Sequence, residues 1–265
     1  MKINAIESSS NSLLKTIRGL QQRHTREKTG LFLIEGRKAV AEARDKRLSI
    51  KDIVVSRSYL QAEPDVVAAR DIGAVSVVDD KLFKELATTT TPEGILAVAA
   101  VPRYQFADLF KGPGNPLIVI AHALQDPGNL GTIIRTSLAA SAGGLVLTAG
   151  TVDAFNPKVV RSAMGALFSL PIVGDVPYAQ AISELKSKGV RIVACDASAS
   201  RRYFECDLRQ PVALVLGNEG QGFTREDLEL ADELVSIPMN AQSESLNVAV
   251  AGAIVLFSAV QQRVT

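Results

Sequence analysis

Apolar positions in the first hundred residues follow helix spacing in some segments and form short continuous runs in others. Between Asn11 and about Lys28, leucine and isoleucine recur every three to four residues, which predicts a helix. Short apolar runs after it predict strands at Leu31–Glu35, Ile50–Ser56, Val75–Val78 and Ile95–Val101. Helices are expected near Arg37–Arg47 and Lys81–Ala87. This first part is predicted to form a compact α/β unit.

The stretch from Pro102 to Pro116 interrupts this pattern. It contains three prolines and two glycines within 15 residues, which indicates a linker. We therefore expect an N-terminal domain over residues 1–102, a linker over 103–116 and a second domain over 117–265.

Beyond the linker, apolar runs and helix-spaced segments alternate. Strands are predicted at Leu117–Ala121, Leu145–Leu147, Leu170–Val173, Arg191–Ala194, Val212–Leu216 and Leu234–Ile237. Helices are predicted at about Leu130–Ala142, Pro157–Phe168, Tyr178–Lys188, Arg225–Ala231 and Leu246–Val260. Continuous apolar strands that alternate with helices indicate a parallel sheet covered on both faces. Ligands of such sheets bind outside the carboxyl ends of the strands.

The last predicted helix, Leu246–Val260, is apolar on nearly every side. Such a helix is expected to be buried. Ser245 and Asn247 lie at its start, and buried polar groups need partners. The sequence thus predicts a ligand pocket at the N-terminal end of this helix.

Composition excludes several classes of protein. Hydrophobic residues make up 47% of the 265 positions and charged residues 22%, as in a globular protein with its own core. Two cysteines form no disulfide framework, and the two histidines lie far apart, so no metal site is expected. The N-terminus lacks a signal peptide, and the longest apolar run, Val248–Val260, is too short to span a bilayer. We expect a cytoplasmic protein that binds no membrane.

Charge is distributed unevenly along the chain. The first 51 residues contain 12 lysines and arginines against 5 acidic residues, whereas the rest contains 17 against 23. A basic front end suggests a surface that binds a polyanion, although a solvated helix face gives the same pattern. The candidate contacts on the first predicted helix are Lys15, Arg18, Arg23, Arg26 and Lys28.

A glycine-rich segment, Gly217–Gly222, follows the predicted strand Val212–Leu216. Its spacing is G-x-x-G-x-G, which is neither a dinucleotide-binding fingerprint nor a phosphate-binding P-loop. This disfavours a nucleotide-dependent oxidoreductase and an NTPase. The glycines fit either a tight turn or a close approach of backbone to ligand. Glu219, within the loop, is a natural hydrogen-bond acceptor.

A third polar segment runs from Asp126 to Arg135. Asn129 is placed to cap the helix that follows, and Arg135 lies at the edge of that helix's apolar stripe among small residues. The guanidinium either reaches past those neighbours into a cleft or extends to solvent as an ordinary surface arginine.

Together these three segments resemble the signature motifs of the SpoU (TrmH-like) branch of the SPOUT RNA methyltransferases. The motifs are Gly128–Arg135, Leu214–Phe223 and Ile237–Phe257, in the family's order, and the resemblance covers roughly Leu117–Val260. It implies a parallel-sheet domain whose chain forms a deep trefoil knot, S-adenosylmethionine (SAM) as cofactor, and a homodimer with its sites at the interface. Asn11–Leu20 and Gly30–Gly36 resemble the substrate-binding domain that such proteins often carry, similar to an RNA-binding ribosomal-protein fold. Ser12 replaces that domain's usual proline.

The resemblance also assigns roles to individual residues. Backbone around Gly217, Ile237 and Leu246 is implied to hold the adenosyl part of SAM, and Arg135 is implied to be the essential catalytic residue. Arg135 either clamps the RNA phosphate or helps to activate the ribose 2′-hydroxyl, and a guanidinium with a pKa above about 12 is a poor base. The predicted catalytic residues are Asn129, Arg135, Glu219, Ser245 and Asn247. The predicted cofactor contacts are Leu216, Gly217, Asn218, Gly220, Ile237, Met239, Ser245 and Leu246. Arg161 is added as a contact to RNA.

The predicted function is a SAM-dependent 2′-O-ribose methyltransferase for structured RNA, with ribosomal RNA favoured by the separate basic domain. Two alternatives stay open at this point. One is a tRNA 2′-O-methyltransferase, and the other is a non-catalytic RNA-binding or ribosome-assembly protein of the same fold.

Overall fold

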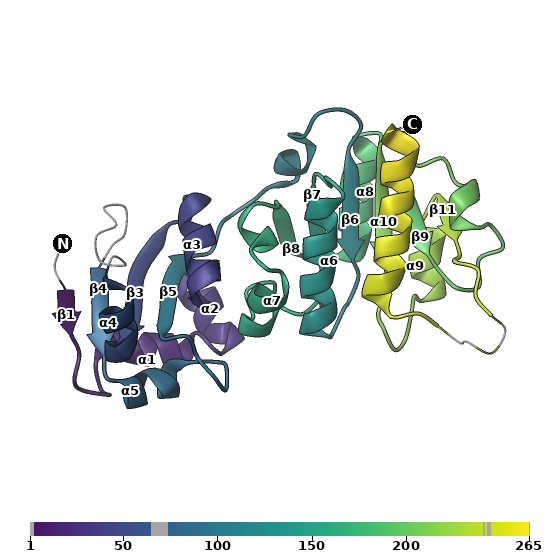
Figure 1. Ribbon diagram of the computed structural model, residues 1–265. Helices are drawn as coiled ribbons and strands as arrows, with labels where there is room; N and C mark the ends of the chain where they lie inside the picture. The colour runs from purple at the N-terminus through teal and green to yellow at the C-terminus, as the bar shows by residue number, and fades with distance from the viewer. Residues whose placement is uncertain (1–2, 65–73, 241, 243–244, 265) are drawn as a thin grey trace. The chain divides into compact units, whose positions relative to one another are not determined.

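A computed structural model describes residues 3–64, 74–240, 242 and 245–264 (Figure 1). The chain divides into two compact units. Unit 1 comprises Met1–Pro102 with Phe155–Phe168, and unit 2 comprises Arg103–Ala154 with Ser169–Thr265. The segment predicted as a linker thus groups with unit 2, and a segment expected in the second domain groups with unit 1.

Unit 1 is a five-stranded mixed sheet with helices. Its strand order is β1-β4-β3-β5-β2, and β5 runs antiparallel to both of its neighbours. The strands are β1 Ile3–Ala5, β2 Leu31–Glu35, β3 Ile50–Ser56, β4 Ala74–Val78 and β5 Ile95–Ala100. The helices are α1 Ser12–Gly19, α2 Arg23–Thr29, α3 Arg37–Asp45, α4 Arg57–Ala62, α5 Asp80–Leu86 and, from the later segment, α7 Pro157–Ser162. The pattern missed β1 and α4, which are short.

The core of unit 1 forms where α1 and α5 bury their apolar stripes on the sheet. Leu14 and Ile17 of α1 and Phe83 of α5 are almost completely buried against strand residues such as Val54. Elsewhere in the unit, the ring of Phe32 on β2 packs 4.9 Å from the ring of Phe155. Burial of these large side chains supplies most of the driving force for folding.

The helix predicted from Asn11 to Lys28 is wrong in one respect, because it is broken into α1 and α2. Arg26 explains the break: its side chain is 3% exposed and donates a 2.8 Å hydrogen bond to the carbonyl of Leu20. That carbonyl would otherwise accept from the backbone four residues later, as in a continuous helix. A basic residue that looked like surface is therefore part of the core.

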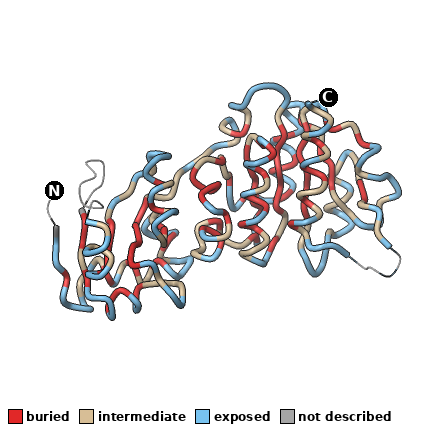
Figure 2. The backbone as a smooth tube through the Cα atoms, viewed as in Figure 1, coloured by how far each residue is buried: buried red, intermediate tan, exposed pale blue. Residues whose placement is uncertain are grey.

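Unit 2 is a six-stranded parallel sheet, as predicted. Its strand order is β11-β9-β10-β6-β7-β8, and every pairing is parallel. The strands are β6 Leu117–Ala121, β7 Gly144–Thr148, β8 Ile172–Val176, β9 Arg191–Cys195, β10 Val212–Leu216 and β11 Glu233–Val235. The α-helices are α6 Pro127–Ala139, α8 Tyr178–Ser187, α9 Arg225–Glu229 and α10 Val248–Val264. All five residues of β6, β7 and β10 are buried, and the red central strands in Figure 2 show this.

Alternating side chains of these strands face different helices. Ile118, Ile120 and Val215 belong to the core that includes Ile182 and Leu185 of α8. On the other face α6 and α10 lie side by side (Figure 1). Gly252 of α10 sits so close to the sheet that a Cβ atom there would lie 2.6 Å from Leu216.

Several predicted boundaries shift by a few residues. The helix predicted at Leu130–Ala142 begins at Pro127, because Asp126 rather than Asn129 caps it by accepting from the Asn129 N–H. The helix predicted at Pro157–Phe168 ends at Ser162, and positive φ angles at Met164 and Gly165 follow. Two predicted strands move to Ile172–Val176 and Glu233–Val235, and a short 3-10 helix, Phe106–Phe110, occupies the predicted linker.

The prediction that the last helix is buried all round is wrong for a single chain. Ala249 and Leu256 of α10 are buried, but Val250 is 49% exposed and Phe257 48% exposed. Leu138 of the neighbouring α6 is 39% exposed as well. The two helices therefore expose apolar side chains to solvent.

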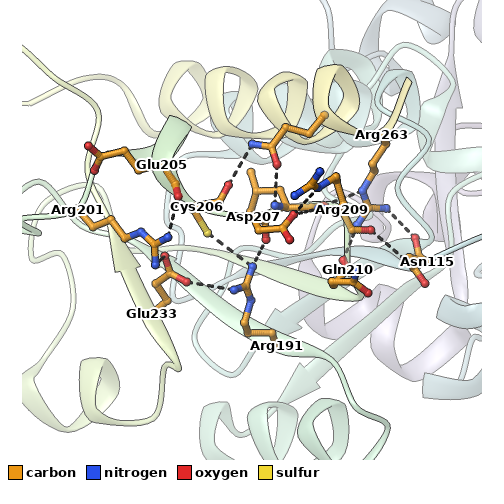
Figure 3. A network of polar contacts seen from close by, with 12 residues as sticks. Asn115, Arg191, Arg201, Glu205, Cys206, Asp207, Arg209, Gln210, Glu233 and Arg263 are labelled. Carbon is orange, nitrogen blue, oxygen red and sulfur yellow. Dashed lines mark hydrogen bonds and ion pairs between the residues drawn. The ribbon is translucent and has the colours of Figure 1, made fainter. Parts of the chain in front are cut away.

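The end of α10 is fastened to the loop between β9 and β10 (Figure 3). Arg263 donates hydrogen bonds to the carbonyls of Leu208, Asn115 and Gln210 at 2.8, 2.6 and 2.9 Å. The neighbouring Gln262 side chain pairs with the Leu208 N–H and the Cys206 carbonyl. These bonds hold α10 in place, and α10 begins at the candidate site.

Candidate functional site

The three signature segments meet at the carboxyl ends of β6 and β10, which are neighbours in the sheet. The connection after β6 leads through α6 to β7 on one side, and the connection after β10 leads through α9 to β11 on the other. Where the connections after two neighbouring strands lead in opposite directions, a crevice opens outside the carboxyl ends of these strands, and ligands bind there.

Glu219 joins two of the segments. Its carboxylate accepts hydrogen bonds from the backbone N–H groups of Gln125 and Asp126, at 3.1 and 3.2 Å, and from the Asn129 side-chain amide at 3.0 Å. The loop after β10 is thereby fastened to the loop after β6 and to the first turn of α6.

Asn129 carries the connection to the third segment. Its side-chain oxygen accepts from the Asn247 amide at 2.8 Å, while its nitrogen is engaged by Glu219. The Asn247 oxygen in turn accepts from the N–H groups of Ala249 and Val250 and so caps α10. Asn129 is thus a link between segments, not the helix cap expected from the sequence. Asn247 caps α10.

Electrostatics keep Glu219 ionised. Partial burial alone would raise the pKa of this carboxyl, but the hydrogen bonds from Asn129, Gln125 and Asp126 outweigh it and hold the pKa below its usual value. A charged acceptor gives stronger hydrogen bonds than a neutral one. The hydrogen-bonded bridge Glu219–Asn129–Asn247 is therefore stable at neutral pH.

A cavity of about 420 Å³ lies beside this bridge, within the usual size range of small-molecule sites. Asp196 and Glu219 contribute carboxylates to it, and the described residues that line it include no lysine, arginine or histidine. This charge fits a cationic ligand such as the sulfonium of SAM. The lining includes all eight predicted cofactor contacts: Leu216, Gly217, Asn218, Gly220, Ile237, Met239, Ser245 and Leu246.

Sequence reasoning missed other lining residues. Asp196 and Ala197 follow β9, and Val248 and Ala251 lie on the first turns of α10. Asp196 is a carboxylate at the end of a predicted strand in a sheet expected to bind ligands there, and that position was the available signal.

The glycine-rich loop combines the two roles considered for it. Gly222 has φ +64° and makes the turn, in which the Asn218 oxygen accepts from the N–H groups of Gly220 and Gln221 at 2.9 Å. Gly217 has no positive φ, but a Cβ there would lie 2.8 Å from the Phe223 ring. One glycine therefore serves conformation and another serves close packing.

An open hollow adjoins the cofactor-sized cavity and shares residues 218–221 with it. Gln125 projects here with a fixed orientation, because its side-chain nitrogen donates to the carbonyls of Ala123 and Gly150 at 2.9 and 2.7 Å. Both partners are acceptors, so the amide cannot be flipped. Its oxygen is presented as an acceptor beside Asn129 and Asn247 in the same hollow.

Arg135 is not brought to this site within one chain. It is exposed, lines neither cavity, and makes no hydrogen bond or ion pair with another residue in the described ranges. It lies six residues beyond Asn129 on α6, which is about 9 Å along the helix axis. It shares a helix face with Leu138, three residues on, which belongs to the exposed apolar surface.

His122 is half-buried, and both of its ring nitrogens have a partner. Its ring nitrogens lie 3.1 Å from the Thr148 hydroxyl and 3.4 Å from the Asp227 carboxylate. The Phe223 ring stacks parallel to it with centroids 5.9 Å apart. This histidine holds the loop after β10 against the sheet.

Cys195 lines the cavity, and its surroundings disfavour the reactive thiolate form. Burial, together with nearby Cys206 and Asp196, raises the pKa of its thiol to about 12. At pH 8 the thiol is therefore protonated, and the thiolate is the nucleophilic form. We expect iodoacetamide to modify Cys195 at least tenfold more slowly in the native protein than in urea, as measured by peptide mass spectrometry. Equal rates would contradict this assignment.

The predicted RNA contacts in unit 1 differ in their availability. Lys15 and Lys28 are exposed. Arg18 pairs with Glu85 at 3.6 Å, and Arg23 pairs with Glu27 at 2.6 Å. Arg26 is buried, which corrects the expectation that it contacts RNA. Arg161 is exposed and lies 3.4 Å from the Thr88 hydroxyl.

Two kinds of feature are absent from the described part of the chain. Histidine, cysteine and carboxylate side chains form no group there that could hold a metal ion. Among the same residues, no helix has the length and apolar character needed to cross a bilayer.

Two family profiles match this chain. The profile of the SpoU rRNA Methylase family matches residues 116–257, and that of the MRM3-like substrate binding domain matches residues 11–97. The chain belongs to the SpoU rRNA methylase family. A 23S rRNA (guanosine(2553)-2′-O)-methyltransferase, RlmP of Bacillus subtilis, is 36% identical over 254 residues, which cover 95% of this chain and 97% of RlmP.

Solved structures agree. An AdoMet-bound rRNA methyltransferase from Sinorhizobium meliloti superposes with a TM-score of 0.86 at 33% identity, and 98% of each chain is covered. The SpoU methyltransferase AviRb from Streptomyces viridochromogenes, in complex with AdoMet, gives a TM-score of 0.88 at 27% identity over 96% of this chain and 99% of that one.

These matches confirm the predicted family, the α/β fold class with its parallel sheet, the methyltransferase activity and SAM as cofactor. The non-catalytic alternative is thereby set aside. The roles of the individual site residues stay predictions.

Proposed function

We propose that this protein transfers a methyl group from SAM to the ribose 2′-hydroxyl of a guanosine in large-subunit ribosomal RNA. The Glu219–Asn129–Asn247 bridge carries the proposal, because it gathers the three segments between a cavity suited to SAM and an open polar hollow. The 36% identity to RlmP over nearly the full length of both chains supports ribosomal RNA rather than tRNA, and guanosine as the target.

Bound SAM supplies an electrophilic methyl group, and the protein's residues orient the two reactants. The backbone of residues 216–220, with Ile237, Met239 and Leu246, would enclose the cofactor. Asn129, Ser245 and Asn247 would position the ribose, and Glu219 would hold Asn129 in place. Proximity and orientation of this kind account for much of the rate gain in such a transfer.

The proposal is tested by incubating the protein with tritiated SAM and either a 23S rRNA transcript or total tRNA. We expect about one methyl group per 23S molecule and one phosphodiester bond that becomes resistant to alkaline hydrolysis. Methylation of tRNA alone, or of a base rather than a ribose, would overturn the proposal.

We further propose that the protein is a homodimer whose subunits meet through α6 and α10. The exposed apolar side chains of Leu138, Val250 and Phe257 support this surface. Arg135 lies on the same face of α6 as Leu138, so a dimer would deliver its guanidinium to the partner's site.

We also infer the family's trefoil knot, since α10 returns from edge strand β11 to pack on α6 and β10. A cytoplasmic location follows from the ribosomal RNA substrate.

Replacing Phe257 with glutamate is expected to break this dimer, because it buries a charge at an apolar contact. Light scattering coupled to size exclusion should show half the mass of the unmodified protein, with an unchanged circular dichroism spectrum. Val264→Glu is the matched control, since Val264 is also exposed but lies at the end of α10. A dimeric Phe257→Glu variant would place the interface elsewhere.

A further inference from the structure

A concentrated group of exposed cations lies at the turn between α3 and β3, outside the first predicted helix. This group, here called the α3–β3 turn, comprises Arg44, Lys46, Arg47 and Lys51. Asp45 is the one acidic residue within 44–51. The four side chains are exposed and form no ion pair or hydrogen bond with any residue in the described ranges.

The first predicted helix contrasts with this turn. Two of its five cations are paired with glutamates and one is buried. A cation engaged by a carboxylate loses that contact when it binds a phosphate, whereas an unpaired one does not. The α3–β3 turn therefore carries more unpaired, exposed cations than the first predicted helix.

The turn also has a shape suited to an anion. Arg44, Asp45, Arg47, Leu48 and Ile50 line a surface hollow of about 500 Å³. Arg44 and Arg47 each contribute a planar guanidinium to it, and this group binds phosphate through paired N–H donors.

The backbone at Arg47 provides a second, independent observation. Arg47 has φ +56°, and it occupies the position just after the helix end where glycine is favoured. Its N–H donates to the Arg44 carbonyl at 2.8 Å, and the next N–H, of Leu48, donates to Ala43 at 2.9 Å. This pair of bonds defines a Schellman helix end, which glycine would form without steric cost. The fold gains nothing from a long cationic side chain here.

Stabilisation of the C-terminal end of α3 would explain only some of the four cations. Cations favour the C-terminal end of a helix, and Arg44 and Lys46 are placed for that. The effect fades within one turn, and Lys51 lies inside β3. Arg47 adopts the positive φ angle of the helix end at a steric cost, so an arginine there does not stabilise the terminus. A binding role accounts for all four.

We propose that the α3–β3 turn binds the phosphate backbone of the RNA substrate. The inference rests on the proposed function, which supplies RNA as the partner. The turn lies within the residues that match a substrate binding domain. It offers backbone contacts that add affinity without reading sequence.

The decisive variant is Arg47→Gly. If Arg47 stabilises the helix end, the variant should melt at a lower temperature and bind RNA normally, whereas a role in RNA binding predicts the opposite. We expect its melting temperature to rise by a few degrees, since the strained position is relieved. We expect its affinity for a 23S rRNA transcript to fall roughly three- to tenfold, and the slope of log K against log salt to become about 0.9 smaller. Lys81→Gln removes an equal charge from an exposed position on α5 and should leave both quantities unchanged.

Affinity is measured by filter binding and stability by thermal melting. If Arg47→Gly binds RNA as well as the unmodified protein, or if Lys81→Gln weakens binding equally, the turn is no specific contact and the proposal is overturned. Arg44→Gln with Arg47→Gln repeats the test without altering helix termination. A lack of methylation by the unmodified protein would refute the proposed reaction, while the binding data would still decide the role of the turn.

Discussion

Replacing Arg135 with alanine will lower the rate of methyl transfer about 10²- to 10³-fold while leaving SAM binding unchanged. The guanidinium has no partner among the described residues and lines no part of the cofactor-sized cavity. Its loss should therefore cost neither stability nor cofactor affinity. Single-turnover transfer from labelled SAM measures the rate, and calorimetry measures the affinity. A variant that transfers methyl groups at the normal rate would show that the site needs no contribution from this residue.

Arg135→Lys separates the two roles that the sequence left open for this residue. A lysine keeps the charge but loses the planar pair of donors. If the guanidinium clamps a phosphate, the lysine variant should recover part of the rate with an unchanged pH profile. If the guanidinium takes a proton, the pH profile should shift, because the ammonium has a lower pKa than the guanidinium.

Mixing two inactive variants tests whether Arg135 acts in the partner's site. We expect Arg135→Ala and Glu219→Ala homodimers to regain about one quarter of full activity after exchange of subunits. In a mixed dimer, one site would combine the intact Glu219 of one chain with the intact Arg135 of the other. If both residues served the same subunit's site, every site would carry one defect and no activity would return.

The strands and helices around the site could be predicted from the sequence more accurately than the contacts within the site. β6 and β10 could be predicted to the residue, because strands buried on both faces are continuous apolar runs bounded by polar loops. The order of the motifs placed three segments at one sheet edge. These features depend on local patterns, which a single sequence records.

The features that were missed depend on contacts between distant residues. Asn129 has the residue type of a helix cap, but Asp126 takes that role and frees Asn129 to join Glu219 and Asn247, which are 90 and 118 positions away. Arg26 looks like a surface cation until the carbonyl of Leu20 is placed beside it. The exposed face of α10 could not be separated from a buried one, because its apolar residues have the same pattern as those of a core helix.

Replacing Glu219 with glutamine tests the bridge on which the site depends. The carboxylate accepts three N–H donors, and a glutamine would turn its own NH₂ group toward some of them. We expect kcat/KM to fall about 10²-fold, because the segment that carries Asn129 would no longer be held in position. The loss of stability should be only about 1 kcal/mol, since Glu219 is exposed and solvent screens its charge.

The pH dependence of that stability loss identifies its cause. The pKa of Glu219 is lower in the folded protein than in the unfolded chain, where it is about 4.3. The stabilisation is therefore fully present above that value and disappears as the pH falls through the folded pKa. Urea unfolding should show a constant difference between the two proteins from pH 6 to 8 and a shrinking one below pH 4. Glu226→Gln, the same change at an exposed residue of α9, should alter neither activity nor stability at any of these pH values. A difference for Glu219→Gln that persists in acid would mean that the side chain acts through packing rather than charge.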